Sequence, residues 1–347
     1  VMRLSFLSSL SVVVISLVVF LPFHNVDACS RIFWNSNGKA MLVARTMDLP
    51  DSPDIYVMPA GISRKGHPIV NPAAEWISKY GSVIMAFWKK SDMCDEGINT
   101  QGLAFHVLYM DGTQYETRDS RPGVMAGIYG QYLLDNAANV AEALTLMSQT
   151  QLTEEYIMFP GHLALEDAAG DSAVVEFIGG QMKVYHGYPY NTTVLTNDPP
   201  FNEQLDNLKQ YRKFGGTLPW PGDVESKDRF VRASAFLSTL NSQPFSPLHP
   251  NLVSRLFSAI RAVSQPFGPK DSWGFSWPTY WTSLFDLTNK AIYFTHTAAQ
   301  NNFWLDMGKL NFSPGAPVLY LQAYRTDLFA WWTKHQDASD IPLLVLP

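Results

Sequence analysis

The chain has 347 residues, of which 46% are hydrophobic and 16% are charged, and its net charge is −6 at pH 7. These proportions are those of an ordinary globular protein with enough apolar side chains for a sizeable core. The acidic balance and the lack of a basic cluster argue against nucleic acid or an anionic membrane surface as a partner.

Residues 1–28 have the features of a secretory signal peptide. Residues 10–23 form a nearly unbroken apolar run, and Val26 and Ala28 place small side chains at the −3 and −1 positions of a cleavage site before Cys29. The run is short for a membrane span, and no later stretch reaches the ~20 apolar residues that a spanning helix needs. We therefore expect export to the periplasm or the medium and no membrane partner for the mature protein.

The mature chain is predicted to begin with a β-hairpin. Residues 29–35 and 39–48 are rich in apolar side chains and flank the sequence Asn-Ser-Asn-Gly. Asn-Gly is the strongest short signal for a hairpin turn. Because the second strand folds back along the first, the end of the hairpin at residues 44–48 should come close to Cys29.

Further along, the predicted strands and helices occur in blocks. Residues 54–61 are expected to extend the first sheet, and apolar residues at spacings of three and four predict a helix over 123–149. Residues 199–223 are rich in Pro, Gly and Asn and are expected to form a surface loop. The other predicted elements are a strand pair at 82–88 and 103–110 with a polar connection, strands at 162–167, 172–178 and 181–187, helices at 227–241 and 249–265, and strands at 280–287, 291–298 and 301–307.

Strands near both ends of the chain with helices between them predict an α+β fold in which antiparallel sheets are covered by helices. No repeat, low-complexity tract or linker divides residues 29–347. We therefore expect a single domain, although its length exceeds the ~250–300 residues above which chains usually split.

Cys29 combines two useful groups if cleavage exposes it. A thiolate is the nucleophile, and a free cysteine has a pKa of about 8.5, so it needs a base or a positive neighbour. The α-amine of the same residue, with a pKa of about 7.7–8.0, could take the thiol proton and later give one to a leaving amine. At the end of the hairpin, Arg45 would favour the thiolate and Asp48 would hold the ammonium form of the amine. A surface ion pair between Arg45 and Asp48 is the alternative.

Two non-enzymatic alternatives concern the same cysteine. Cys29 and Cys94 are the 2 cysteines of the chain, and in an oxidising compartment they could form a structural disulfide. The sequence Val-Asp-Ala-Cys also loosely resembles a lipobox, in which case the protein would be an anchored lipoprotein without catalytic activity. The 8 histidines are scattered without metal-ligand spacing, so neither a metal nor another cofactor is expected.

Seven motifs resemble, in order, those of the choloylglycine hydrolase family, which contains conjugated bile acid hydrolases and penicillin V acylases. They are CSRI, ARTMD, EGINTQGLAFHVLYM, HLALEDAAGDSAVVEF, VLTNDPPFNEQLDNL, PGDVESKDRFVRA and YWTSLFDLTNKAIYFT. The resemblance implies the N-terminal nucleophile (Ntn) hydrolase fold, a four-layer αββα sandwich of antiparallel sheets flanked by helices. It also implies hydrolysis of a linear C–N amide bond through an acyl-thioester on the N-terminal cysteine.

The resemblance assigns the nucleophile and its charged neighbours. Cys29 matches the family nucleophile, with its α-amine as base. Arg45 matches the arginine beside that nucleophile, and Asp48 matches the aspartate that holds the amine. The implied substrate is a small N-acyl amide with an apolar acyl group.

Three further positions carry implied roles. Tyr109 matches the position whose backbone N–H helps to form the oxyanion hole, and Asn197 matches the asparagine whose side-chain amide supplies the other donor. Arg229 matches the arginine that completes the polar network. Without the family, Asn197 would be read as a turn residue, Arg229 as a helix-surface residue and Tyr109 as a core aromatic.

Tyr109 also bears on the substrate. Bile salt hydrolases of the family tend to have asparagine there and penicillin V acylases tyrosine, which favours an acylase with an aromatic or fatty acyl substrate; N-acyl-homoserine lactones are the alternative. The segment 211–219 is shorter than the hairpin that helps relatives to assemble tetramers, which leaves homo-oligomerisation open. Candidate pocket-wall residues, which core packing explains as well, are Met47, Tyr56, Met58, Phe87, Phe105 and Met110.

Overall fold

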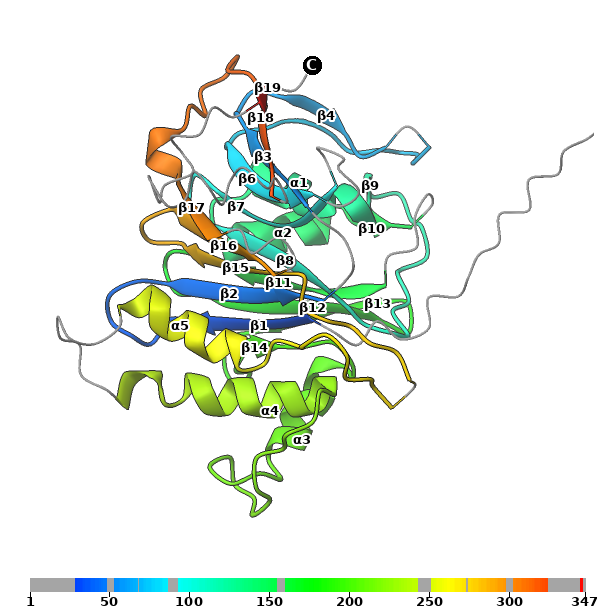
Figure 1. The fold of residues 1–347 in the computed structure, drawn as a ribbon. Coiled ribbons are helices and arrows are strands. Elements are labelled where there is room, and N and C mark those ends of the chain that lie inside the picture. The colour runs from blue at the N-terminus through cyan, green and yellow to red at the C-terminus, as the bar shows by residue number, and fades with distance from the viewer. Residues whose placement is uncertain are drawn as a thin grey trace, which may run out of the picture.

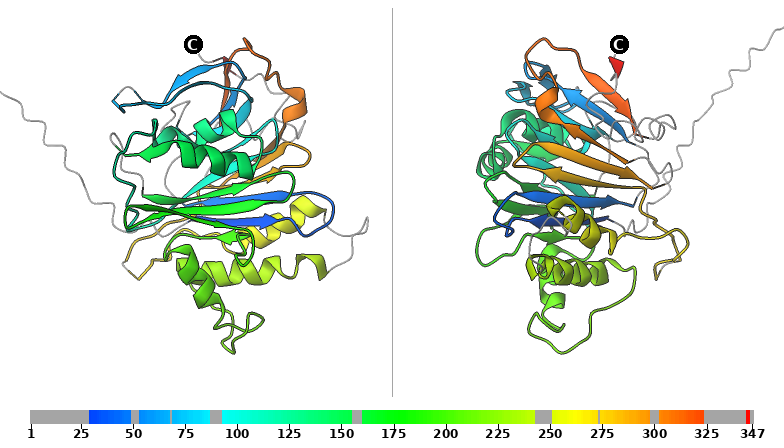
Figure 2. Two further views of the ribbon diagram at one scale, coloured as in Figure 1. Left: turned by 180° about the vertical axis from the view of Figure 1, so that it is seen from behind. Right: turned by 60° about the vertical axis from the view of Figure 1, so that its left-hand side comes forward.

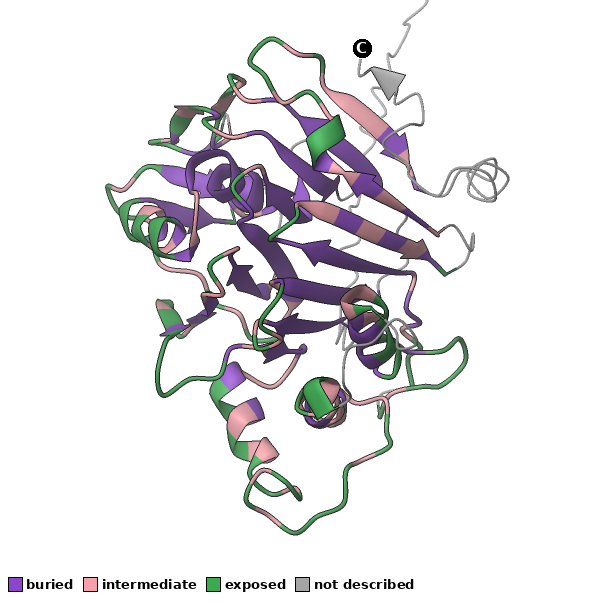
Figure 3. Ribbon diagram, turned by 90° about the vertical axis from the view of Figure 1, so that its left-hand side faces the viewer, coloured by how far each residue is buried: buried purple, intermediate pink, exposed green. Residues whose placement is uncertain are grey.

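The computed structural model describes residues 29–48, 53–67, 69–86, 93–154, 160–242, 251–272, 274–297, 302–323 and 344–345. The predicted signal segment, residues 1–28, lies outside the described residues. Two antiparallel sheets lie face to face, with helices on their outer sides (Figure 1). Most strands of the two sheets are buried at the centre of the molecule, and many of the exposed residues lie in loops and on the outer helices (Figure 3). The helix Ala126–Asn136 is almost entirely buried, whereas the edge strand Gln181–His186 is largely exposed.

The first sheet contains the N-terminal hairpin at its centre and pairs it with strands from the far end of the sequence. The β1–β2 hairpin is confirmed, with Trp34 opposite Leu42 and Cys29 opposite Met47. Asn37 shapes the connection, because its side-chain oxygen accepts hydrogen bonds from the N–H groups of Lys39 and Ala40. In spatial order the strands are β14 (Val194–Leu195), β1 (Cys29–Trp34), β2 (Leu42–Met47), β15 (Trp281–Asp286), β16 (Ala291–His296) and β17 (Asn302–Asp306).

The second sheet is longer and includes two strands that the sequence did not place correctly. Residues 54–61 were expected in the first sheet, but their strand, β3 (Asp54–Met58), pairs in the second sheet with β6 (Ser82–Ala86) and β18 (Leu319–Gln322). The polar connection 89–102 contains β7, which lies between β6 and β8. In spatial order the strands are β13 (Gln181–His186), β12 (Ser172–Ile178), β11 (Gly161–Glu166), β8 (Ala104–Tyr109), β7 (Cys94–Asn99), β6 (Ser82–Ala86), β3 (Asp54–Met58), β18 (Leu319–Gln322) and β19 (Leu344–Val345).

Helices cover the outer face of each sheet (Figure 2). On the first sheet, α4 (Ser226–Leu237) packs on β1 and α5 (Leu252–Arg261) packs on β2. On the second sheet, α1 (Ala126–Asn136) packs on β7 and β8. Gly130 permits this close approach, because a Cβ atom there would lie 2.3 Å from the ring of Phe105.

One predicted helix and one predicted loop need correction. The helix predicted over 123–149 is divided: β9 (Gly123–Met125) precedes α1, and α2 (Val140–Gln149) begins after a break at which Asn139 caps the new helix. The loop predicted over 199–223 contains α3 (Phe201–Leu208), which packs against α4. The remaining short elements are β4 (Ser63–Lys65), β5 (Glu75–Ile77), β10 (Gln151–Thr153), and the 3₁₀ turns Leu240–Ser242 and Met307–Lys309.

A layer of charged side chains lies between the two sheets. Arg31 on β1 forms an ion pair with Glu166 on β11. Glu166 lies 3.3 Å from His106 on β8, and the other ring nitrogen of His106 lies 3.1 Å from Glu96 on β7. Arg45 on β2 follows at 3.8 Å from Glu96. All of these side chains are buried, so each charge depends on its neighbours rather than on water.

His106 is the cation that Glu96 and Glu166 share, and its replacement by leucine should destabilise the fold. Burial alone would lower the pKa of His106, but the two carboxylates raise it above its ordinary value. Removing one partner of a buried ion pair costs about 3–5 kcal/mol. We expect a loss of that size in the free energy of unfolding, measured by urea denaturation at pH 6.

The exposed pair His186–Asp171, with 2.9 Å between the charged atoms, supplies the control. His186→Leu should cost less than about 1 kcal/mol of the free energy of unfolding.

Because the pKa of His106 is raised on folding, its contribution to stability is complete below the unfolded pKa and disappears as the pH rises through the folded pKa. The cost of His106→Leu should therefore shrink with rising pH, and a cost that stays constant would contradict a charged His106.

Candidate active site

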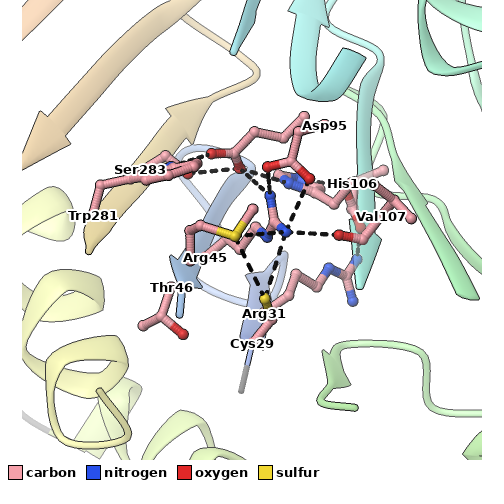
Figure 4. Close-up of polar contacts among 12 residues, drawn as sticks. Cys29, Arg31, Arg45, Thr46, Asp95, His106, Val107, Trp281 and Ser283 are labelled. Atoms are coloured by element: carbon pink, nitrogen blue, oxygen red, sulfur yellow. Dashed lines mark hydrogen bonds and ion pairs between the residues drawn. The ribbon is translucent and has the colours of Figure 1, made fainter. Parts of the chain in front are cut away.

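The register of the hairpin brings the sulfur of Cys29 to the guanidinium of Arg45. Residues opposite each other in antiparallel strands point to the same side, and Cys29 is opposite Met47 while Arg31 is opposite Arg45. The Nη2 atom of Arg45 lies 3.6 Å from Cys29 Sγ, and Met47 Sδ lies 3.9 Å from the same sulfur (Figure 4). All of these side chains are buried between the sheets.

Asp95 on β7 fixes the position of Arg45. Its carboxylate oxygens accept from Nη1 at 2.5 Å and from Nη2 at 3.2 Å. The Nη2 group also donates to the carbonyl oxygen of Val107 at 2.7 Å. The guanidinium is therefore held by the second sheet while it faces the sulfur of Cys29 on the first (Figure 4).

Arg229 on α4 contacts the backbone of Cys29 from the helix side of the first sheet. Its Nη1 group donates to the carbonyl oxygen of Cys29 and to Ser30 Oγ, both at 2.6 Å. Its Nη2 group donates to Asn197 Oδ1 at 3.1 Å, and Nε donates to the carbonyl of Val224 at 3.0 Å. Arg229 is fully buried, so the interpretation as a helix-surface arginine does not apply.

Asn197 joins the nitrogen of Cys29 to Tyr109. Its Oδ1 accepts a hydrogen bond from the Cys29 nitrogen, and its Nδ2 donates to the carbonyl oxygen of Tyr109 at 2.9 Å. Ala28 precedes Cys29 in this chain, so that nitrogen is an amide here and stands in for the amine of a cleaved chain. The structure thus brings Tyr109 and Asn197 together, but their contact uses the Tyr109 carbonyl and not the N–H named by the resemblance.

Asp48 is buried directly after β2. Its Oδ1 accepts from the hydroxyl of Thr279 at 2.5 Å, while Oδ2 is buried without a hydrogen-bond partner among the described residues. Burial raises the pKa of Asp48 to about 7, against the opposing effects of Arg229 and Thr279. A cationic amine beside Oδ2 would stabilise the carboxylate; that Asp48 holds the amine stays a prediction.

The environment of the thiol keeps it protonated. Burial raises the pKa of Cys29 to about 11, and the nearby Arg45 lowers it only in part. A thiol with a raised pKa acts as a nucleophile only if a base within reach of the sulfur removes its proton.

Several features of the site were not found from the sequence. Asp95 fell in a segment expected to be a loop, and Thr279 lies outside the quoted motifs. Cys29 and Cys94 are both free and buried, so the structure does not contain the Cys29–Cys94 disulfide considered as an alternative. Of the proposed pocket-wall residues, Met47 contacts the sulfur and Phe87 lies outside the described residues.

The described part of the chain contains neither a candidate metal site nor a candidate membrane-spanning helix. No group of three or more His, Cys, Asp or Glu side chains there could hold a metal ion. None of the helices among those residues is long and apolar enough to cross a membrane.

Comparison with known proteins identifies the family. The family model of linear amide C–N hydrolases, choloylglycine hydrolase family, matches residues 29–320. A penicillin V acylase from Pectobacterium atrosepticum is 31% identical over 320 residues, 83% of each chain. A bile salt hydrolase/transferase from Lactiplantibacillus plantarum is 27% identical over 203 residues, 51% of this chain and 59% of that protein.

Solved structures share the fold. The structure of penicillin V acylase from Agrobacterium tumefaciens superposes with a TM-score of 0.78 at 31% identity, covering 92% of this chain and 98% of that one. A conjugated bile acid hydrolase from Clostridium perfringens gives a TM-score of 0.72 at 19% identity, covering 86% and 97%, which supports the fold alone. The expected αββα architecture is confirmed, and the protein acts on non-peptide C–N bonds: the chain belongs to the choloylglycine hydrolase family of linear amide C–N hydrolases.

Proposed function

We propose that the protein is an exported N-acyl amide hydrolase that uses the thiol of an N-terminal Cys29 as its nucleophile. The observation that carries the proposal is the placement of the two functional atoms of Cys29. Its sulfur lies 3.6 Å from the cationic Arg45, and its nitrogen bonds to Asn197. The match to the family model begins at Cys29, which supports removal of residues 1–28 before the enzyme becomes active.

The reaction proceeds in two steps in which the same amine carries the proton. The free α-amine of Cys29 takes the thiol proton as the sulfur attacks the amide carbon, and a tetrahedral oxyanion forms. The C–N bond then breaks as the ammonium gives that proton to the leaving amine, and an acyl-thioester remains. Water attacks the thioester in turn, loses a proton to the amine, and releases the carboxylic acid as the thiol is restored.

The surrounding side chains stabilise the charges that develop during these steps. The Arg45 guanidinium lies beside the sulfur as it becomes anionic. The Asn197 amide nitrogen has one hydrogen on Tyr109 and a second that can donate to the oxyanion. We propose that Asp48 stabilises the ammonium form of the amine through Oδ2, which has no hydrogen-bond partner among the described residues.

The substrate proposed is an amide with an aromatic or fatty acyl group, as in penicillin V. Tyr109 occupies the position where penicillin V acylases of this family tend to have tyrosine, and the similarity to the Pectobacterium atrosepticum penicillin V acylase extends over more of the chain than that to the bile salt hydrolase/transferase. N-acyl-homoserine lactones are the second candidate. Release of amine from penicillin V, long-chain N-acyl-homoserine lactones and glycine- or taurine-conjugated bile acids, measured side by side, decides among them.

Trapping of the acyl-enzyme tests the mechanism. Acid quenching during turnover of penicillin V should yield protein whose mass is increased by one acyl group on Cys29, and hydroxylamine should remove it. Intact mass of the exported protein should also begin at Cys29. A mature protein with a lipid-modified Cys29, or turnover without any acyl group on that residue, would contradict the proposal.

A further inference from the structure

We propose that Asp95 is a positioning residue that holds the Arg45 guanidinium against the nucleophile. This inference rests on the proposed function of Cys29. Asp95 lies on β7 of the second sheet and bonds to Arg45, which comes from β2 of the first sheet and lies beside Cys29 Sγ. The ion pair between Asp95 and Arg45 therefore links the two sheets at the reacting sulfur.

The hydrogen bonds of Arg45 show why one carboxylate controls its position. Asp95 accepts from both Nη1 and Nη2, and Val107 accepts from Nη2 through its carbonyl. Nε of Arg45 is buried without a hydrogen-bond partner among the described residues. Without Asp95, Nη2 of the guanidinium would still donate to the Val107 carbonyl. The carboxylate left near Nη1 would be that of Glu96, which is more distant at 3.8 Å. The 3.6 Å distance to Cys29 Sγ would no longer be fixed from behind.

Asp95 also moderates the charge that Arg45 presents. Its carboxylate opposes the effect of Arg45 on the pKa of Cys29. Burial raises the pKa of Asp95 itself, and the Arg45 guanidinium opposes that rise. Removing the negative charge of Asp95 should lower the pKa of the Cys29 thiol. Removing its hydrogen bonds to Arg45 should change the position of the guanidinium beside the sulfur. The charged or titratable groups that face Asp95 from the elements around it are Cys29, Arg45, Cys94, Glu96 and His106.

Two substitutions separate position from charge. Asp95→Asn keeps the shape and one oxygen that accepts from the guanidinium, so it should retain most of kcat, while loss of the negative charge lowers the thiol pKa. Alkylation of Cys29 by iodoacetamide, followed by peptide mass spectrometry, should then begin at lower pH than in the wild type. Asp95→Ala releases the guanidinium and should lower kcat by about 10²-fold with little change in KM, because small misplacements of catalytic groups have effects of that size.

Asp135 provides a matched control, since it is a buried aspartate with its own arginine, 3.0 Å from Arg64, and a 2.7 Å hydrogen bond from Trp76. Asp135→Ala should lower stability as Asp95→Ala does, but leave kcat and the alkylation profile of Cys29 unchanged. Equal losses of kcat in both alanine variants, or wild-type kcat and alkylation in Asp95→Ala, would overturn the role of Asp95. Full turnover in Cys29→Ala would instead refute the proposed function, so the two failures are distinguishable.

Discussion

Replacement of Cys29 by alanine should reduce hydrolysis of the preferred N-acyl amide by a factor on the order of 10⁴ or more. The sulfur is the atom that would form the acyl-thioester, and in the proposed mechanism the neighbouring groups transfer the proton or stabilise charge but form no bond to the acyl group. Alanine keeps the backbone nitrogen and carbonyl that bond to Asn197 and Arg229, so the variant should fold and bind substrate. Turnover is measured by release of the free amine, and folding by urea denaturation.

Cys94 is the matched control for this substitution, because it is the other free and buried thiol. Cys94→Ala should retain kcat, with a small loss of stability from the missing sulfur. Cys29→Ser should also be nearly inactive, since a hydroxyl is harder to deprotonate than a thiol and the α-amine is a weak base for it. Activity in Cys29→Ala, or loss of activity in Cys94→Ala alone, would show that the sulfur of Cys29 is not the nucleophile.

The hairpin and its consequences could be predicted from the sequence. The Asn-Gly signal and the apolar runs on either side predicted β1 and β2, and folding back of the second strand predicted the proximity of Cys29 and Arg45 that the structure shows. These are local features, in which a turn and two adjacent strands fix each other. The strand meander at 162–187 was predicted for the same reason.

Elements whose nature depends on distant partners were predicted less well. The segment containing β7 is polar because its side chains carry the charges between the sheets, and polar composition normally indicates a loop. Residues 54–58 have the composition of a strand, but nothing in the sequence tells which sheet they join. Asp95 was missed because its partner Arg45 lies fifty positions earlier in the chain.

Cys29, Arg45 and Asp48 were predicted from the residues and the hairpin, whereas the rest of the candidate site was located through the family resemblance. Asn197, Arg229 and Tyr109 each had a plainer interpretation, and the structure replaces two of these with buried contacts to Cys29. Asn197 and Arg229 lie 168 and 200 positions from Cys29 in the sequence, which explains why spacing could not reveal their contacts with it. These residues come together only when the sheets and the helix α4 have assembled.

Asn197→Asp should lower kcat by about 10²- to 10³-fold, the usual cost of losing one oxyanion-hole donor. The carboxylate can still accept from the Cys29 nitrogen and from Arg229, but it has no hydrogen for the carbonyl of Tyr109, which Nδ2 contacts at 2.9 Å in the wild type. Two oxygens would then face each other in a buried site. We expect a loss of stability of about 1–3 kcal/mol at neutral pH.

The number of hydrogens distinguishes the structural role of Asn197 from the catalytic role proposed for it. A protonated aspartic acid has a single hydrogen, which would bond to Tyr109, whereas the amide has a second hydrogen for the substrate oxyanion. Lowering the pH should therefore restore the stability of Asn197→Asp, measured by urea denaturation, without restoring its kcat relative to the wild type.

Asn99 is the control, because it is a buried asparagine whose Nδ2 group donates to the carbonyls of Leu134 and Ala137 at 2.9 and 2.7 Å, away from the nucleophile. Asn99→Asp should lose stability and keep kcat. If acid restored both stability and turnover to Asn197→Asp, the second hydrogen of the amide would have no part in the reaction. Asn197 would then act only by holding Tyr109, Arg229 and the Cys29 nitrogen in place.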